Sequence, residues 1–570
     1  MDFKFDVRRK DAAGRIGRLD IGGRLVETPM LMPVYNPTRD IIPVKELVDV
    51  YKAQAVMVNS YMLLKNQELR SQVLSHGLHK FLGFDGVVAT DSGSYQLMLY
   101  GAVETTNKDI IKFQEDIGSD IGSFLDIPTL PDTYKPRAKE QLGVTLERAK
   151  EAKDAKFLVN AAVQGGKYTD LRAEAAREIG KEFSLAAIGG IVPLMESYRF
   201  SELVNVIAAV KENMPLDRVV HAFGLGHPMV FPLAALLGCD LFDSAAYILY
   251  AMDGRYMTDY GTVRVDELEY VSCRCPICAE HGLGLKRLYG DDKVKAIARH
   301  NLHVSYAMLD KVKQAIIDGR LWELVLLQSR AHPKMMEGLT ALMEHTEWIA
   351  EVDPVTKDSA FYYTGQESER RSEVLNAKKR MGNLTTDNTV ELPPFGLVHE
   401  ELLDIYPFNG VWAVNDEPKP KVRDIYKLRA IMEYQFGKGA GELLPDNLVV
   451  KKSRNTRRIR WLYEGREMIA SVRASDHMIL PHDKLAAKLK EKFPTPKLRV
   501  IMKDDEEALQ CVRDGKSAMC KFVEDVDPDL RCGDECLIVD KNDNLLKVGT
   551  LMLSPREIKD YKRGMAARIR

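Results

Sequence analysis

The chain has 570 residues, more than one hydrophobic core usually organises, so we expect two to four domains. Hydrophobic residues make up 45% and charged residues 29%, as in soluble globular proteins, and no apolar run is long enough to span a membrane. The N-terminal residues MDFKFDVRRK contain no hydrophobic signal segment, so the sequence predicts a cytoplasmic protein. The formal net charge of −2 argues against indiscriminate coating of nucleic acid, so RNA contacts must come from local basic patches.

Eight short apolar segments recur between Met30 and Asp243, most of them separated by amphipathic helical stretches such as residues 170–183 and 200–214. Strands that are apolar throughout and alternate with helices indicate a parallel sheet. Eight such units predict an α/β fold of the (β/α)₈ TIM-barrel type, with a doubly wound open sheet as the alternative. The eight segments are MLMPVYN near Met30, AVMVNS at Ala55, GVVATDSG at Gly86, IGSFLDIPT at Ile121, FLVNAAVQGG at Phe157, SLAAIGGIVP at Ser184, RVVHAFGLGHP at Arg218 and CDLFDSAAY at Cys239.

Polar side chains and glycines follow these strands, where a barrel places its active site. Asp91 alone equally suits a helix N-cap, but capping would not favour glutamine or paired glycines at the same rim. The sequence has no GxxxxGK[ST] phosphate loop and only a fragment of a dinucleotide-binding fingerprint, which argues against nucleoside triphosphate and dinucleotide enzymes. The residues of the predicted rim are Asp91, Asp126, Gln164, Gly189, Gly190, Gly224, Gly226 and Asp243.

Three of the eight cysteines, Cys273, Cys275 and Cys278, fall within six residues, which indicates a metal site in a reducing compartment. A histidine on the following helix would complete a tetrahedral Cys₃His zinc site with a structural role, since four protein ligands leave no position for water. His300 and His303 are both candidates, because residues three apart share a helix face. The alternative is that three buried free thiols are clustered by chance. We interpret the remaining five cysteines as structural or free thiols.

Beyond about Ile349 the sequence becomes more polar and is interrupted by prolines, which indicates small appended domains. The segment from Lys451 to Arg466 holds seven basic residues and one acidic residue, interleaved with Trp461 and Tyr463. It is either a solvated strand face or a phosphate-contacting patch with stacking aromatic rings. The last stretch, from about Lys497, alternates like a small β domain and ends in the basic tail KRGMAARIR.

Taken as a set and in this order, these motifs resemble those of the tRNA-guanine transglycosylases over about the first 350 residues. The last 74 or so residues resemble a PUA domain, an RNA-binding β barrel, through LRCGDECLIVD, LLKVGTLMLS and GMAARIR. The combination is similar to the archaeal, archaeosine-type enzymes. The resemblance implies a catalytic barrel with a zinc site at 1–350, small α+β RNA-contacting domains at 351–496 and a PUA domain at 497–570. The motifs that carry the first resemblance are TDSGSYQ, FLDIPT, VQGG, AIGG, LFDSA and CxCx₂C followed by RHNL.

For the reaction, the resemblance implies exchange of guanine at position 15 of the tRNA D-arm for 7-cyano-7-deazaguanine (preQ0). Asp243 would be the nucleophile and Asp91 the general acid and base, with the reversed assignment as the alternative. Asp126 would bind the base, together with Ser92, Gln164, Gly190 and Ile191. The resemblance also favours His300 over His303 as the fourth ligand of one structural zinc, and implies tRNA, guanine and preQ0 as partners of a homodimer.

Two other functions remain open at this point. A noncatalytic tRNA-binding paralogue would be expected to lack Asp91 or Asp243, and an archaeosine synthase acts on preQ0 that is already inserted. The intact set of Asp91, Asp126 and Asp243 argues against both. Where bacterial family members often have TDSGGYQ and FDC, this chain has Ser94 and Ser244, and its run after Gly190 also differs from the bacterial pattern.

Overall fold

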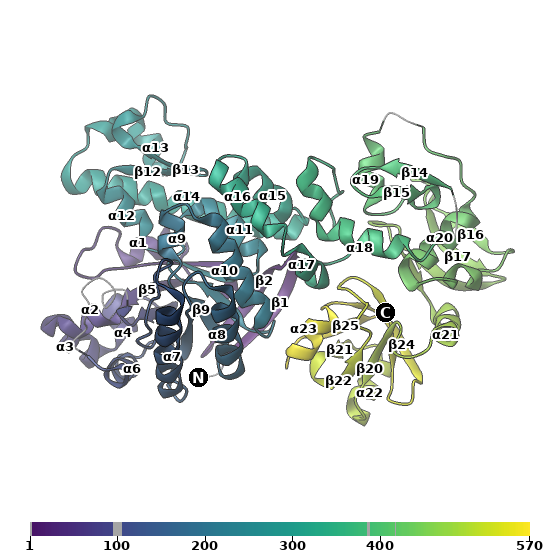
Figure 1. Ribbon diagram of the computed structural model, residues 1–570, viewed down its shortest axis with the longest axis horizontal. Coiled ribbons are helices and arrows are strands. Elements are labelled where there is room, and N and C mark those ends of the chain that lie inside the picture. Colours follow the sequence, from purple (N-terminus) through teal and green to yellow (C-terminus); the bar gives the residue numbers. More distant parts are fainter. Residues whose placement is uncertain (1–2, 95–104, 385–387, 416–417) are drawn as a thin grey trace. The chain divides into compact units, whose positions relative to one another are not determined.

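The computed structural model of the chain describes residues 3–94, 105–384, 388–415 and 418–570. The chain divides into two compact units, Met1–Leu342 and Met343–Arg570 (Figure 1). No helix among the described residues is long and apolar enough to cross a membrane.

Eight parallel strands form the centre of the first unit, in the order β4-β11-β10-β9-β8-β7-β6-β5. A parallel bridge between Val34 and Met57, with Tyr35 N 2.8 Å from Met57 O, brings the two outer strands together and nearly closes the sheet into a barrel. The predicted (β/α)₈ architecture is therefore confirmed, and each of the eight predicted segments contains one strand. The strands are β4 (Met30–Pro33), β5 (Ala55–Asn59), β6 (Val87–Asp91), β7 (Ile121–Gly122), β8 (Leu158–Val163), β9 (Leu185–Ile188), β10 (Val219–Ala222) and β11 (Leu241–Ser244).

Helices surround the barrel, and the two predicted helices are α8 (Thr169–Glu182) and α10 (Phe200–Asn213). In α8 the buried residues Leu171, Ala175 and Ile179 follow a four-residue spacing, which puts them on one helix face. The other helices of the barrel are α1 (Val44–Asp49), α2 (Ser60–Lys65), α3 (Gln67–His76), α4 (Leu78–Leu82), α6 (Asn107–Asp116), α7 (Lys135–Glu151), α9 (Val192–Glu196), α11 (Phe231–Leu236), α12 (Ala246–Met252), α14 (Gly290–Asp318), α15 (Leu321–Ser329) and α16 (Pro333–Leu342).

An antiparallel sheet that the sequence analysis did not identify covers one end of the barrel. It consists of β1 (Phe3–Asp11), β2 (Gly14–Ile21) and β3 (Arg24–Thr28). Its side chains Phe5, Leu19, Ile21 and Val26 share one hydrophobic cluster with the first residue of each barrel strand, from Met30 to Leu241. The amino ends of the strands are therefore sealed, and the carboxyl ends form the end that is left for chemistry.

A small insertion lies between α12 and α14. It contains the hairpin of β12 (Arg255–Thr258) and β13 (Gly261–Arg264), followed by α13 (Pro276–His281) (Figure 1). The insertion holds the three clustered cysteines and packs on α14.

The described residues of the second unit form three sheets with short helices between them. In α20 (Asp424–Phe436) the residues Leu428, Met432 and Phe436 are buried and recur every four positions, on one face of the helix. The sheets are β14 (Thr389–Leu392) with β15 (Gly396–His399); β16 (Val449–Lys452), β17 (Ile459–Glu464), β18 (Glu467–Val472) and β19 (Ile479–Pro481); and β21 (Ala518–Met519), β25 (Met565–Ile569), β24 (Leu545–Leu551), β23 (Glu535–Val539), β20 (Arg499–Met502) and β22 (Val523–Val526). The other helices are α17 (Thr346–Val352), α18 (Ser372–Met381), α19 (Phe408–Ala413), α21 (Asp483–Lys492), α22 (Glu506–Arg513) and α23 (Pro555–Asp560).

Candidate active site and metal centre

Asp91 is the last residue of β6, at the carboxyl end of the barrel. Its Oδ2 accepts a hydrogen bond from Asn59 Nδ2 at 2.9 Å, because β5 and β6 pair with Asn59 directly opposite Asp91. Its Oδ1 accepts a longer bond from the Gly93 amide at 3.3 Å. Burial, together with the charges of Asp126 and Asp243, raises the pKa of Asp91 to about 7, although the hydrogen bond from the Gly93 amide acts to lower it. Asp91 therefore has a carboxyl group that can both donate and accept a proton near neutral pH.

Asp243 lies on β11, where two donors hold one of its carboxylate oxygens. Oδ1 is 2.9 Å from His221 Nε2 and 2.5 Å from the Gly224 amide. Asn160 Nδ2 lies 3.0 Å from the other ring nitrogen of His221, so the amide donates to Nδ1 and the ring proton sits on Nε2, facing Asp243. Among the described residues, Oδ2 of Asp243 has no hydrogen-bond partner. The carboxylate is thus oriented through one oxygen and leaves the other available for attack.

Asp126 follows β7, as the sequence predicted, and lies in an irregular segment. Gln164 Nε2 donates to its Oδ2 at 2.6 Å. Burial raises the pKa of Asp126, whereas hydrogen bonds from Ser94 and Gln164 oppose that rise. The buried guanidinium of Arg172 also interacts with Asp126, and desolvation lowers the pKa of Arg172 to about 9.

A narrow cavity of about 80 Å³ lies at this end of the barrel. Two glycines shape its wall. A Cβ at Gly189 would come within 2.2 Å of Gln164 Nε2, and Gly190 has φ of +69°, which side chains other than glycine rarely adopt. Asp243 and Ile191 are not among its lining residues. The residues that line it include Asp91, Ser92, Ser94, Asp126, Asn160, Gln164, Gly189, Gly190, Val192, Pro193 and Phe223.

The structure brings together most of the residues that the sequence singled out, and Ile191 is the exception. The side chain of Ile191 is buried, and its carbonyl accepts the amides of Leu194 and Met195 at the start of α9. Tyr95 and Gln96, the last residues of the TDSGSYQ motif, lie outside the described residues.

Sequence reasoning missed Asn59, Asn160, His221 and Arg172. The available signal was a single polar residue inside an otherwise apolar strand, as in VVHA of β10 and LVNAAV of β8. Arg172 lies in the helical segment at Asp170, where an arginine normally faces solvent, and nothing in the pattern indicated that it is fully buried.

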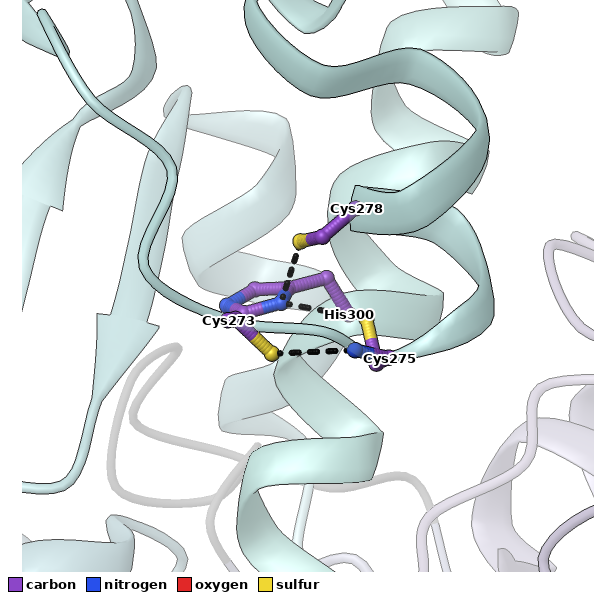
Figure 2. A group of neighbouring side chains, drawn as sticks. All are labelled: Cys273, Cys275, Cys278 and His300. Atoms are coloured by element: carbon purple, nitrogen blue, oxygen red, sulfur yellow. Dashed lines mark hydrogen bonds between the residues drawn. The ribbon is translucent and has the colours of Figure 1, made fainter.

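The ligand atoms of Cys273, Cys275, Cys278 and His300 all lie within 4.8 Å of one another (Figure 2). His300 Nδ1 is 3.3 Å from Cys278 Sγ and 3.6 Å from Cys275 Sγ. The opposite ring nitrogen, Nε2, donates to the Met257 carbonyl at 2.8 Å. That bond fixes the ring with Nδ1 toward the sulfur atoms, the arrangement of a metal-ligating histidine. These four residues could hold a tetrahedral metal ion with about 2.3 Å metal–sulfur bonds.

His303, the alternative ligand, is not part of this cluster. Its ring lies against Tyr51, with ring centroids 4.6 Å apart. Both histidines are on α14, but their side chains meet different neighbours. The structure thus selects His300 as the residue that meets the cysteines.

The two basic segments of the second unit differ in their surroundings. Lys451 Nζ lies over the Tyr463 ring at 4.4 Å, while Arg454, Arg457 and Arg458 are exposed. In the tail, Lys562, Arg563 and Arg568 are exposed, but Arg570 forms an ion pair of 2.5 Å with the buried Glu535.

Comparison with known proteins matches nearly the whole chain. A family model described as queuine tRNA-ribosyltransferase matches residues 10–334, one for the patch-forming domain C2 of tRNA-guanine transglycosylase matches 426–496, and one for the PUA domain matches 501–570. Three relatives are each named tRNA-guanine(15) transglycosylase. That of Thermococcus kodakarensis is 44% identical, over 100% of this chain and 99% of its own length. That of Pyrococcus furiosus is 42% identical, over 100% of this chain and 97% of its own length. That of Methanocaldococcus jannaschii is 37% identical, over 99% of this chain and 99% of its own length. The chain belongs to the family of archaeal tRNA-guanine(15) transglycosylases, with transglycosylase, C2 and PUA domains.

Proposed function

We propose that this chain exchanges guanine at position 15 of tRNA for preQ0 through a covalent ribosyl-enzyme intermediate. The observation that supports this reaction best is the state of the two carboxyl groups. Asp243 is held by His221 and Gly224 through one oxygen only, and Asp91 nearby has a pKa of about 7. A nucleophile and a separate proton donor are the two groups that a double displacement at an anomeric carbon requires.

In the first step, Oδ2 of Asp243 attacks C1′ of the ribose, and the bond between C1′ and the guanine nitrogen breaks. Protonated Asp91 gives its proton to the departing guanine, whose ring nitrogen takes the bonding electron pair. The hydrogen bonds from His221 Nε2 and the Gly224 amide hold Asp243 Oδ1 and so orient the carboxylate before the attack.

In the second step, ionised Asp91 removes the proton from preQ0. The ring nitrogen of preQ0 attacks C1′, and the ester bond to Asp243 breaks, which restores its carboxylate. Because each displacement inverts the configuration at C1′, the exchange as a whole retains it. The same carboxyl group serves as acid and then base, which a pKa near 7 favours at neutral pH.

The base lies in the cavity against Asp126 and Gln164 in this proposal, with Ser92 and the Gly190 backbone completing the contacts. Asp126 accepts hydrogen bonds from the N–H and amino groups of the base. The glycines at 189 and 190 let a flat ring approach the backbone, which suits a cavity too narrow for a bulky ligand. Ile191 contributes through its backbone alone, since its side chain is buried.

The Cys₃His cluster holds one zinc ion per chain in this proposal. Zinc would cross-link the insertion to α14 and take no part in the exchange, because four protein ligands leave no position for a substrate. Residues 1–350 would then form the catalytic domain. Residues 351–496 and 497–570 would form the domains that bind tRNA. A homodimer stays a prediction, which light scattering of the purified protein tests.

The test is exchange of radiolabelled guanine and of preQ0 into unmodified tRNA transcripts. We expect incorporation into a transcript with guanine at position 15 and none when adenine replaces it. The Asp243→Asn variant, which keeps the size of the side chain, should bind the same transcript without exchange. Tight tRNA binding by the unaltered chain with no exchange of either base would instead indicate a noncatalytic paralogue.

A further inference from the structure

A second cavity lies within the second unit, and nothing in the base-exchange reaction uses it. Its volume is about 500 Å³, within the range of pockets that bury a small ligand. It is formed by α19, α20, the turn at 400–402 and the loop that joins β16 to β17. The walls are partly apolar, with Ile405, Leu428, Ile431 and Val472, and Tyr362 adds an aromatic ring.

Three of the residues that line the cavity carry a buried acceptor atom that lacks a partner in the described parts of the chain. Glu401 Oε2, Asn409 Oδ1 and His477 Nε2 are each buried with no hydrogen-bond partner among the described residues. Glu401 is 5% exposed and His477 is 9% exposed, so water does not solvate them freely. Buried polar atoms are nearly always paired in native proteins, and three unpaired ones around one cavity point to a ligand that supplies the donors.

The protonation of His477 can be read from its other ring nitrogen. Nδ1 lies 2.5 Å from the Asp404 carbonyl, so Nδ1 carries the proton and donates. Burial lowers the pKa of His477, and the neighbouring Arg458 lowers it further, so the ring is neutral and Nε2 is an acceptor. All three unpaired atoms thus call for N–H or O–H groups on the ligand.

The mouth of the cavity is basic. Lys419 and Lys427 pair with Asp404, and Lys452 pairs with Asp424 at 2.7 Å. Arg457 and Arg458 are exposed and have no carboxylate partner in the described parts of the chain. Two unpaired guanidinium groups side by side in the sequence suit a phosphate, which they can bind in a bidentate manner.

We propose that this cavity binds one extruded nucleotide of the tRNA, with its base inside and its phosphates at Arg457 and Arg458. The acceptors Glu401, Asn409 and His477 match a base that carries an amino group, and Tyr362 offers a surface for stacking. A free mononucleotide has the same chemistry, so the experiment separates the two sources. The proposal does not depend on which base the barrel exchanges.

The first arm of the test measures the affinity of the full chain for an unmodified tRNA transcript. Arg458→Ala should weaken binding about tenfold, the effect of losing one charged contact. Arg454→Ala is the matched control, because it removes the same charge from the same exposed loop without lining the cavity. It should weaken binding no more than about twofold. Glu401→Gln should also weaken tRNA binding about tenfold, since it removes the charge and replaces one of the two acceptor oxygens by an NH₂ donor.

The second arm titrates the four ribonucleoside monophosphates into the same proteins by calorimetry. A chemical probe that reacts with the amino groups of bases is then applied to the tRNA bound to each protein. We expect one base to be protected by the unaltered chain and to become reactive when the tRNA is bound to Ala413→Trp. Ala413 is an exposed residue at the end of α19 that lines the cavity, so tryptophan there fills the cavity without disturbing the core. Thermal melting of each variant checks folding, and Ala413→Trp and Arg458→Ala decide the outcome if Glu401→Gln does not fold.

The proposal is supported if Arg458→Ala and Ala413→Trp both lose tRNA affinity while Arg454→Ala keeps it. One tRNA base should also become reactive to the chemical probe in Ala413→Trp. If a monophosphate binds to the cavity and the variants leave tRNA affinity unchanged, the ligand is a free nucleotide and the tRNA assignment is wrong. If Arg458→Ala and Arg454→Ala have equal effects and no base is deprotected, the cavity binds no nucleotide and the proposal is overturned.

Discussion

His221 Nε2 lies 2.9 Å from Asp243 Oδ1, deep inside the barrel, where the His221 side chain is fully buried. Asn160 fixes the opposite ring nitrogen, so the three residues form a hydrogen-bonded row from β8 through β10 to β11. This row orients the carboxylate that we propose as the nucleophile, and His221 acts as a positioning residue.

Replacing His221 tests that role. His221→Phe should lower kcat about 10- to 100-fold with little change in the KM for tRNA, because it removes a donor to Asp243 without touching the tRNA surface. His221→Gln can place an amide donor near the position of Nε2 and should recover most of the activity. Equal losses in both variants, or a change confined to KM, would contradict a positioning role.

The covalent step is tested by trapping the RNA adduct on denaturing gels. Asp243→Ala should abolish the adduct and leave tRNA affinity within about threefold, because the oxygen that forms the ester is gone while the RNA-contacting surface is intact. Asp91→Ala should still form some adduct, more slowly. An adduct that survives in Asp243→Ala and disappears in Asp91→Ala would reverse the assignment of the two residues.

The raised pKa of Asp91 predicts a pH-dependent effect on stability. Between its ordinary value of 3.8 and about 7, the unfolded chain ionises this group while the folded chain does not, so stability falls as pH rises through this window. Asp91→Asn should therefore stabilise the protein above pH 7, by up to about 4 kcal/mol for a shift of this size. The gain should shrink as the pH falls toward 4. Urea unfolding of both proteins at pH 5 and pH 8 measures it, and a gain that grows on acidification would disprove the raised pKa.

The metal centre predicts one zinc per chain by elemental analysis. Cys275→Ser and His300→Ala should each lower the zinc content and reduce the melting temperature by about 5 °C or more, because a bound structural metal contributes directly to folding free energy. His303→Ala is the matched control on the same helix and should keep its zinc. Full zinc occupancy in His300→Ala with loss in His303→Ala would show that the ligand is His303.

The basic tail predicts part of the salt dependence of tRNA binding. Replacing Lys562, Arg563 and Arg568 together by alanine should weaken binding and lower the slope of log affinity against log salt by up to about 2, since fewer phosphates are neutralised. Arg570 is left unchanged because its ion pair with Glu535 supports the fold. An unchanged slope would mean that the tail does not contact phosphate.

Local sequence patterns were sufficient for the barrel and for most of the site. Strands that are buried on both faces must be apolar along their length, so the eight strands could be located from short runs of apolar residues. Their carboxyl ends share one edge, so Asp91, Asp126, Gln164 and Asp243 could be assigned to one site without coordinates. The cap formed by β1 to β3 was not predicted, because its strands mix exposed and buried residues and its core partners lie up to about 240 positions away in the sequence.

Only the tertiary structure decided what surrounds each of these groups. His300 and His303 are equivalent by spacing, and the choice between them follows from how α14 rotates against the insertion, which no local pattern encodes. The sequence identified the arginines near 457 as a basic segment, but not that Glu401 and His477 lie unpaired beside them in one cavity. The pKa of Asp91 depends on burial and on the charges of Asp126, which follows β7, and of Asp243, which lies on β11. Periodicity reports which face of an element is buried, whereas contacts between distant residues depend on how whole elements pack.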